Sequence, residues 1–221
     1  MSLGANKQAL MGAAGASSAG GEFYSHQIAN SVRMSDSANS TLKFTAGTPT
    51  SGKTFTYSWW WKRYNIDSTS TQSSNVFCAG TGGGTYVFWP FTNSSTPQFN
   101  GNFSGGNFGD NRLTTDMVFR DPASWYHCVL RFDSTQAATA NRVRMYVNGE
   151  EPTYADASVQ SAIAQDGTYS FMNQSGVVQS WGGISGVGTG GEGVDAQLAE
   201  IVMCDGQSYA PTEFGETKNG M

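Results

Sequence analysis

The chain has 221 residues, a length that fits one large all-β domain. Charged residues make up only 13%, about half the usual share, whereas 28 residues are Gly and 13% are aromatic. The net charge is −5 without a Lys/Arg cluster, which argues against nucleic acid and membrane partners because both require a basic surface. No apolar run approaches the roughly 20 residues that cross a bilayer, and the secretory signal pattern is missing. We therefore expect a protein that is made and kept soluble inside a cell.

The cysteines are Cys78, Cys128 and Cys204, three residues far apart in strand-like runs. Disulfide frameworks and zinc sites need paired spacing, so this odd set predicts buried thiols in a reducing compartment. The chain also has no P-loop, dinucleotide fingerprint or EF-type calcium spacing. We expect neither a metal nor a cofactor.

Residues 1–27 are dominated by Gly, Ala and Ser and cannot form their own core. Ordering such a segment costs about 25 to 50 kcal/mol of backbone entropy, more than it would easily recover by lying on its own domain. It is either a floppy tail or an assembly arm docked on neighbouring subunits, and we expect the arm. The large side chains available to anchor it are Leu3, Leu10, Met11, Phe23 and Tyr24.

From residue 28 onward, side chains alternate with the period of a half-buried strand. In residues 54–62 the core-facing set is Phe55, Tyr57, Trp59 and Trp61, which leaves Trp60 on the polar face. Residues 125–132 and 142–149 show the same alternation, and we expect them to form neighbouring strands. Residues 148–149 are Asn-Gly, a strong hairpin-turn dipeptide. The strands around Trp59 and Leu130 should be the most buried.

Six further strands are expected, with Gly/Ser/Asn/Thr loops between them and no helix of ten residues or more. This pattern predicts two packed antiparallel sheets, an all-β sandwich over residues 28–216 followed by a short tail at 217–221. The further strand candidates are residues 40–44, 75–80, 85–91, 113–119, 177–183 and 196–204.

An enzymatic function is not expected. Glycosidases need two carboxylates across a groove, but Glu200 and Asp205 are five apart, on opposite faces by strict alternation. With only two histidines, a Ser/His/Asp triad has few ways to assemble, and His127 is typical of a sheet-face residue. Glu200 is expected to pair with a polar neighbour on its sheet.

A glycan site is an alternative, since loop aromatics can stack on sugars while Asn and Asp bind hydroxyls. The loop 100–112 offers both types, although the Trp residues could instead fill the core and the loop could simply be long. Trp181 is a further candidate. The possible glycan contacts are Trp60, Trp89, Asn102, Phe103, Asn107, Phe108 and Asp110.

Four blocks, residues 28–44, 54–65, 119–150 and 198–216, resemble laminin G-like, concanavalin A-like jelly-roll proteins of tailed, especially marine, bacteriophages. The most specific parts are SWYH…NRVRMYVNG and LAEIVMCDGQ…FGE. The resemblance implies a jelly roll of two curved sheets, a virion-associated role and no defined active site. Because the chain stops soon after FGE, we expect a stand-alone module.

The resemblance implies a virion protein that is assembled in the host cytoplasm. We expect a capsid decoration or cement protein whose arm binds other virion proteins, the major capsid protein or tail components, while the jelly roll faces outward. Closed symmetry favours a homo-oligomer, and a trimer would fit a threefold position. The alternative is a tail-fibre module that recognises a host-surface glycan.

Overall fold

The computed structural model describes residues 30–35, 40–64, 76–80, 85–93, 96–102, 111–169, 171–183 and 193–215. For residues 85–93 and 96–102 the description covers the backbone. The expected domain boundaries at 27/28 and 216/217 lie outside the described residues, so they remain predictions. Among the described residues, no helix has the length and apolarity to span a bilayer.

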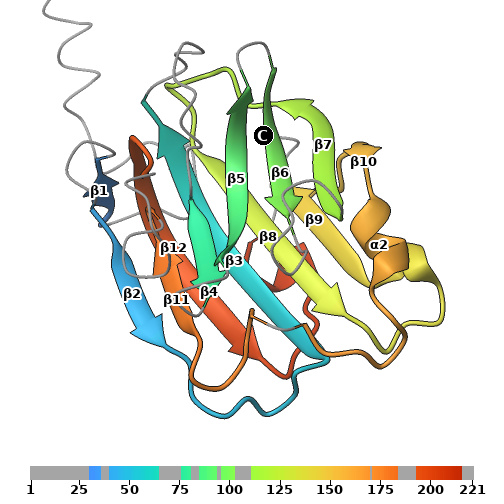
Figure 1. The fold of residues 1–221 in the computed structure, drawn as a ribbon. Helices are drawn as coiled ribbons and strands as arrows, with labels where there is room; N and C mark the ends of the chain where they lie inside the picture. Colours follow the sequence, from blue (N-terminus) through green and yellow to red (C-terminus); the bar gives the residue numbers. More distant parts are fainter. Residues whose placement is uncertain are drawn as a thin grey trace, which may run out of the picture.

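Two antiparallel sheets pack face to face, which confirms the predicted β-sandwich (Figure 1). The five-stranded sheet has the order β1 (Val32–Met34), β12 (Ala196–Asp205), β3 (Thr54–Arg63), β8 (Tyr126–Asp133) and β9 (Val143–Val147). The seven-stranded sheet has the order β10 (Tyr154–Asp156), β7 (Arg112–Val118), β6 (Thr96–Asn102), β5 (Thr85–Asn93), β4 (Phe77–Gly80), β11 (Val178–Trp181) and β2 (Leu42–Thr45). Within the described residues, three short helices accompany the sheets: α2 (Ser158–Ala162), η1 (Thr139–Asn141) and η2 (Pro211–Glu213).

Strand β3 lies at the centre of the five-stranded sheet, and its aromatic residues fill the core. The four side chains predicted to face inward are all buried, and so is Leu130 on the adjacent strand β8. Phe55 stacks on Phe132 of β8 with ring centroids 4.5 Å apart. The Tyr57 hydroxyl donates to Gln179 Oε1 of β11 across the sandwich, at 3.0 Å. The two sheets are therefore joined by aromatic packing and by a buried hydrogen bond.

The predicted neighbours β8 and β9 pair along five residues, from Cys128↔Val147 to Phe132↔Val143. Asn148 and Gly149 form the expected tight turn, both with positive φ, 51° and 87°. The hairpin expected there does not continue, however. After a single bridge between Val147 and Glu150, the chain crosses to the other sheet, where β10 pairs with β7.

Both ends of the stretch 100–112, which was expected to be a loop, belong to strands, because β6 extends to Asn102, where it pairs with both β5 and β7, and β7 begins at Arg112. Asn100 and Gly101 have weak strand propensity, and the ladder on both sides overrides it. The sequence patterns also did not identify β1 or β10, each three residues long. Such short strands carry too little alternation to be recognised.

Candidate functional site

A polar cluster lies on the outward face of the five-stranded sheet, where β3 and β8 run side by side. Trp60 stands opposite His127, and the two rings stack with centroids 4.8 Å apart and planes 24° from parallel. A hydrogen bond of 2.9 Å joins Ser58 Oγ and His127 Nε2. Ser58 is 2% exposed and His127 is 6% exposed, whereas Trp60 is half-buried. The indole is therefore the member of this group that is open to solvent.

Glu200 reaches this cluster from a β-bulge in the neighbouring strand β12. The pairing of β12 with β3 shifts between Ala199, which stands opposite Trp60, and Val202. Glu200 lies within this bulge and has a φ of 48°, a left-handed conformation that is unfavourable for a residue with a side chain. Bulges of this kind redirect side chains. The bulge explains why strict alternation could not predict the environment of Glu200, which is exposed.

Burial lowers the pKa of His127, and the Glu200 carboxylate opposes that shift without cancelling it. The imidazole is therefore neutral at neutral pH. A buried serine bonded to a neutral histidine has the composition of a nucleophile and its base. Because Ser58 is covered, we interpret the pair as a satisfied polar contact on the sheet. The groups that reach solvent are the half-buried Trp60 indole and the exposed Glu200 carboxylate, which together can contact a sugar ring and its hydroxyls.

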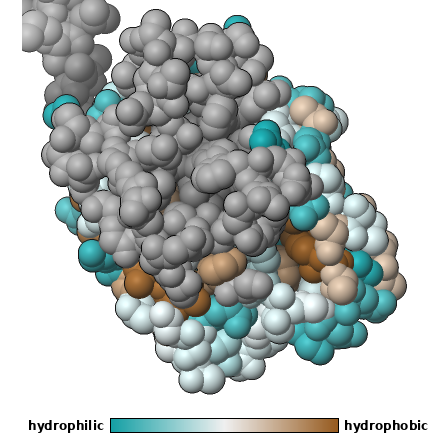
Figure 2. All heavy atoms as spheres, in the orientation of Figure 1, coloured by the Kyte–Doolittle hydropathy of each residue, from teal (hydrophilic) through white to brown (hydrophobic). Residues whose placement is uncertain are grey.

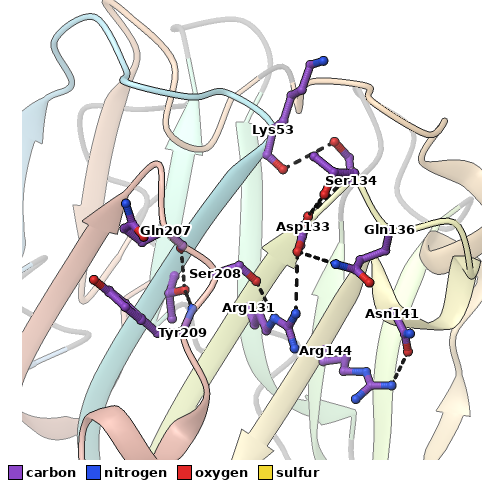
Figure 3. Close-up of polar contacts among 12 residues, drawn as sticks. Lys53, Arg131, Asp133, Ser134, Gln136, Asn141, Arg144, Gln207, Ser208 and Tyr209 are labelled. Carbon is purple, nitrogen blue, oxygen red and sulfur yellow. Dashed lines mark hydrogen bonds and ion pairs between the residues drawn. The ribbon is translucent and has the colours of Figure 1, made fainter.

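A second set of polar contacts holds the C-terminal segment, residues 205–214, across the outward faces of β3 and β8. The Thr56 hydroxyl donates to the Gln207 carbonyl at 2.8 Å and accepts from the Tyr209 amide at 2.9 Å. Arg131 donates to the Ser208 hydroxyl and lies 3.6 Å from the Asp133 carboxylate. Figure 3 shows these contacts converging on the ends of the two strands. Thr56 is thus buried on the face that simple alternation assigns to solvent.

The carboxylates beside this segment are occupied by protein donors. Burial alone would raise the pKa of Asp133, but hydrogen bonds from Thr135 and Gln136 outweigh it and the pKa is lowered. Burial likewise raises the pKa of Asp205. Hydrogen bonds from donors that include the Thr50 amide outweigh this effect, so the pKa of Asp205 is also lowered. Within the described residues, no group of three or more His, Cys, Asp and Glu side chains could hold a metal ion. We therefore assign these acids a structural role.

The structure gives different positions to the residues predicted to contact glycan. Trp60 lies in the outward cluster, Trp89 is in β5, and Asn102 is the last residue of β6 rather than a loop residue. Trp181 is wrong as a surface candidate, because it is buried against Tyr57, Trp59 and Phe77. The remaining loop candidates, Phe103, Asn107, Phe108 and Asp110, lie outside the described residues, as do Leu3, Leu10, Met11, Phe23 and Tyr24 of the arm.

The cluster of Trp60, Ser58, His127 and Glu200 was not predicted as a unit. The alternation had already assigned Trp60 and His127 to the polar faces of two strands. The alternation does not predict that these two strands pair, or where the bulge in β12 lies. Both depend on contacts distant in sequence.

Residues 36–185, more than half of the chain, match the family model described as Concanavalin A-like lectin/glucanases superfamily. The chain belongs to this superfamily. No curated protein sequence matches it significantly.

Among solved structures, domain 4 of AbnA, a GH43 extracellular arabinanase from Geobacillus stearothermophilus, in complex with arabinotriose, has a TM-score of 0.54. It is 14% identical, and the match covers 89% of this chain and 81% of that domain. A native heptameric SAP-like pentraxin from Limulus polyphemus gives 0.48 at 13% identity, covering 74% of this chain and 68% of the pentraxin. A Trypanosoma rangeli sialidase gives 0.48 at 13% identity, covering 85% of this chain and 28% of the sialidase. Likeness at this level of identity shows the fold alone and assigns no enzymatic activity.

The environment of His127 predicts a pH dependence of stability. Its ordinary pKa is 6.5 and its folded pKa is lower, so as pH falls through 6.5 the unfolded chain binds a proton that the folded chain does not. The contribution of His127 to the free energy of unfolding should therefore be fully present above about pH 7 and should decline as the pH falls below that value. Urea unfolding at several pH values between 7.5 and 5.5 measures this decline.

In that experiment His127→Gln should remove part of the decline while keeping a hydrogen-bond partner for Ser58. His26→Gln is the control, because His26 is the other histidine of the chain, and it should leave the decline unchanged. A decline of equal size in His127→Gln would contradict this account of the buried imidazole.

Proposed function

We propose that this chain is a non-enzymatic component of a bacteriophage particle, a capsid decoration or cement protein. Its N-terminal arm docks on neighbouring subunits and its jelly roll faces outward. Such a protein stabilises a shell because it binds the assembled state and not the free subunits. A homo-oligomer, with a trimer at a threefold position, fits this role.

The proposal rests on the two sequence blocks that most resemble phage jelly-roll proteins, SWYH…NRVRMYVNG and LAEIVMCDGQ…FGE. Residues of these two blocks contact one another in the structure. Arg131 and Asp133 come from the first block, and Gln207, Ser208 and Tyr209 come from the second. These residues hold the C-terminal segment across the sheet (Figure 3). The resemblance therefore lies in residues that maintain a rigid body, as expected for an architectural protein.

Two features near the sheet surface also favour binding over catalysis. The hydroxyl of Ser58, which is hydrogen-bonded to His127, is buried. The Asp205 carboxylate accepts hydrogen bonds from Thr50 and Asn173, so its oxygens are already engaged. Neither group is poised to attack a substrate.

A second candidate function is glycan recognition by a tail-fibre or receptor-binding module. Half-buried Trp60, supported by His127 and close to the bulge that carries Glu200, favours this function. An indole held at a fixed angle can stack on a sugar ring at little entropic cost. The similar fold of the AbnA domain, solved with arabinotriose, is compatible with such a ligand.

The arm can be tested by removing residues 1–27. We expect this variant to keep the circular dichroism spectrum and urea midpoint of the full chain but to lose cosedimentation with phage particles that lack the protein. The matched variant keeps the full chain length and carries the substitutions Leu3→Ser, Leu10→Ser and Met11→Ser. It should also lose binding, because the apolar anchors rather than the length supply the contact. Undiminished particle binding by the shortened chain would contradict the cement function.

The glycan function can be tested on arrays of bacterial surface saccharides. If the full chain binds one of them, Trp60→Ala should weaken the affinity about tenfold or more, which corresponds to about 1.4 kcal/mol. Trp60→Phe should retain most of the binding because it keeps an aromatic face. Tyr209→Ala changes an exposed aromatic residue outside this cluster and should have no effect. Blank arrays, or equal binding by Trp60→Ala, would exclude Trp60 as the contact.

A further inference from the structure

The outward face of β3 continues past Trp60 with Lys62 and Tyr64, because side chains on one face of a strand recur at every second residue. Trp60 and Lys62 are half-buried and Tyr64 is 39% exposed, whereas the residues between them are buried. The Tyr64 amide donates to the Asp195 carbonyl at 2.9 Å, so the pairing of β3 with β12 extends to Tyr64. A second aromatic side chain therefore shares the outward face with Trp60.

The neighbouring strands place an amide and a second cation beside these side chains. Gln197 of β12 stands between Lys62 of β3 and Arg33 of β1, because it is directly opposite both. Directly opposed residues share one face of a sheet. The guanidinium carbon of Arg33 lies over the Tyr64 ring, 5.5 Å from its centroid, in a cation–π contact. We call Trp60, Lys62, Tyr64, Gln197 and Arg33 the outer stripe.

Charges of both signs are interspersed around the outer stripe. Its cations are Lys62 and Arg33. Glu200 is exposed at the bulge beside one end, Asp195 pairs with the other end, and Asp121 interacts electrostatically with Lys62. An acidic ligand would be opposed by these carboxylates, and a basic ligand would be opposed by the cations. The charges therefore fit an uncharged ligand that both donates and accepts hydrogen bonds.

The other side of the sandwich exposes a different kind of side chain. Figure 2 shows hydrophobic surface at the lower left, where Figure 1 places the end of β2 in the seven-stranded sheet. Leu42 and Phe44 of β2 are each 45% exposed. Their side chains offer sugar hydroxyls no hydrogen bond. The outer stripe instead combines aromatic rings with polar groups, which suits the apolar faces and the hydroxyls of a sugar.

We propose that the outer stripe binds an uncharged, linear oligosaccharide that runs along β3, with one sugar ring on Trp60 and another on Tyr64. This inference rests on the glycan function described above and extends it from one aromatic contact to a chain of rings. The two aromatic residues are four positions apart, about 13 Å along the strand, which exceeds the length of one sugar ring. Lys62 and Gln197 lie between them and can bind the hydroxyls of the intervening rings.

The dependence of affinity on ligand length tests this proposal. The probes are gluco-, manno-, galacto- and arabino-oligosaccharides of one to six rings, titrated into the full chain. For the series that binds, affinity should rise by about tenfold or more once the probe reaches both aromatic residues, because two contacts within one ligand act together. Equal affinity for the shortest and the longest probe would overturn the proposal.

Substitutions separate this proposal from the glycan function on which it rests. Tyr64→Ala should remove the gain in affinity with length, and Tyr64→Phe should keep most of it because the aromatic ring remains. Tyr209→Ala is the matched control, since Tyr209 is 37% exposed, and it should leave the gain unchanged. Urea midpoints equal to that of the unmodified chain would show that each variant is folded.

The outcomes distinguish the two ideas. If Trp60→Ala weakens binding while Tyr64→Ala leaves the gain with length intact, the glycan function stands and the outer stripe is contradicted. If no probe binds, or if neither substitution changes binding, both are contradicted.

The charge of the ligand can be tested with salt and with acidic probes. The affinity for the uncharged probe should change little between low and high sodium chloride, because screening acts on charge pairs. Oligogalacturonides of the same lengths should bind more weakly than the uncharged probe. Tighter binding of oligogalacturonides that is lost at high salt would contradict the assignment of an uncharged ligand.

Discussion

The central constraint on this fold is that both faces of β3 are covered, by different kinds of partner. On the core side, Phe55, Tyr57, Trp59 and Trp61 exclude water and bring the second sheet into contact through Trp181 and Gln179. On the outward side, buried Thr56 and Ser58 need hydrogen-bond partners, because an unpaired buried hydroxyl costs about 1 to 3 kcal/mol. Thr56 forms its hydrogen bond with the C-terminal segment, and Ser58 forms its hydrogen bond with His127. The outward side of β3 is therefore closed at Thr56 and Ser58, while Trp60 is half-buried and Glu200 beside it is exposed.

The sequence predicted the parts of this fold that are encoded by alternation. The core faces of β3, β8 and β9 and the pairing of β8 with β9 are confirmed because bulky side chains recur at every second residue. The strands that escaped prediction are too short, or, like β6, too rich in Gly and Asn. The site was less predictable. Trp60 was a candidate, but its contact with His127 depends on the register of β3 and β8. The interaction of Glu200 with His127 depends on the bulge in β12.

The superfamily match fixes the architecture and leaves the role open, since this fold serves binding and catalysis alike. Our proposal depends on how the chain distributes its side chains. A rigid sandwich secures its C-terminal segment with specific hydrogen bonds, and its N-terminal segment is too poor in large side chains to form a core. Such an organisation suits a protein that binds an assembled surface through its arm. The surface around Trp60 remains available for a second ligand, which is why glycan recognition stands as the alternative.

A reconstruction of a whole phage particle containing this chain tests the central claim most directly. The account predicts that the jelly roll lies on the outer surface of the head, with residues 1–27 extending over the joins between capsid subunits. Placement of the chain only in the tail, or an N-terminal segment folded entirely against its own sandwich, would contradict the account.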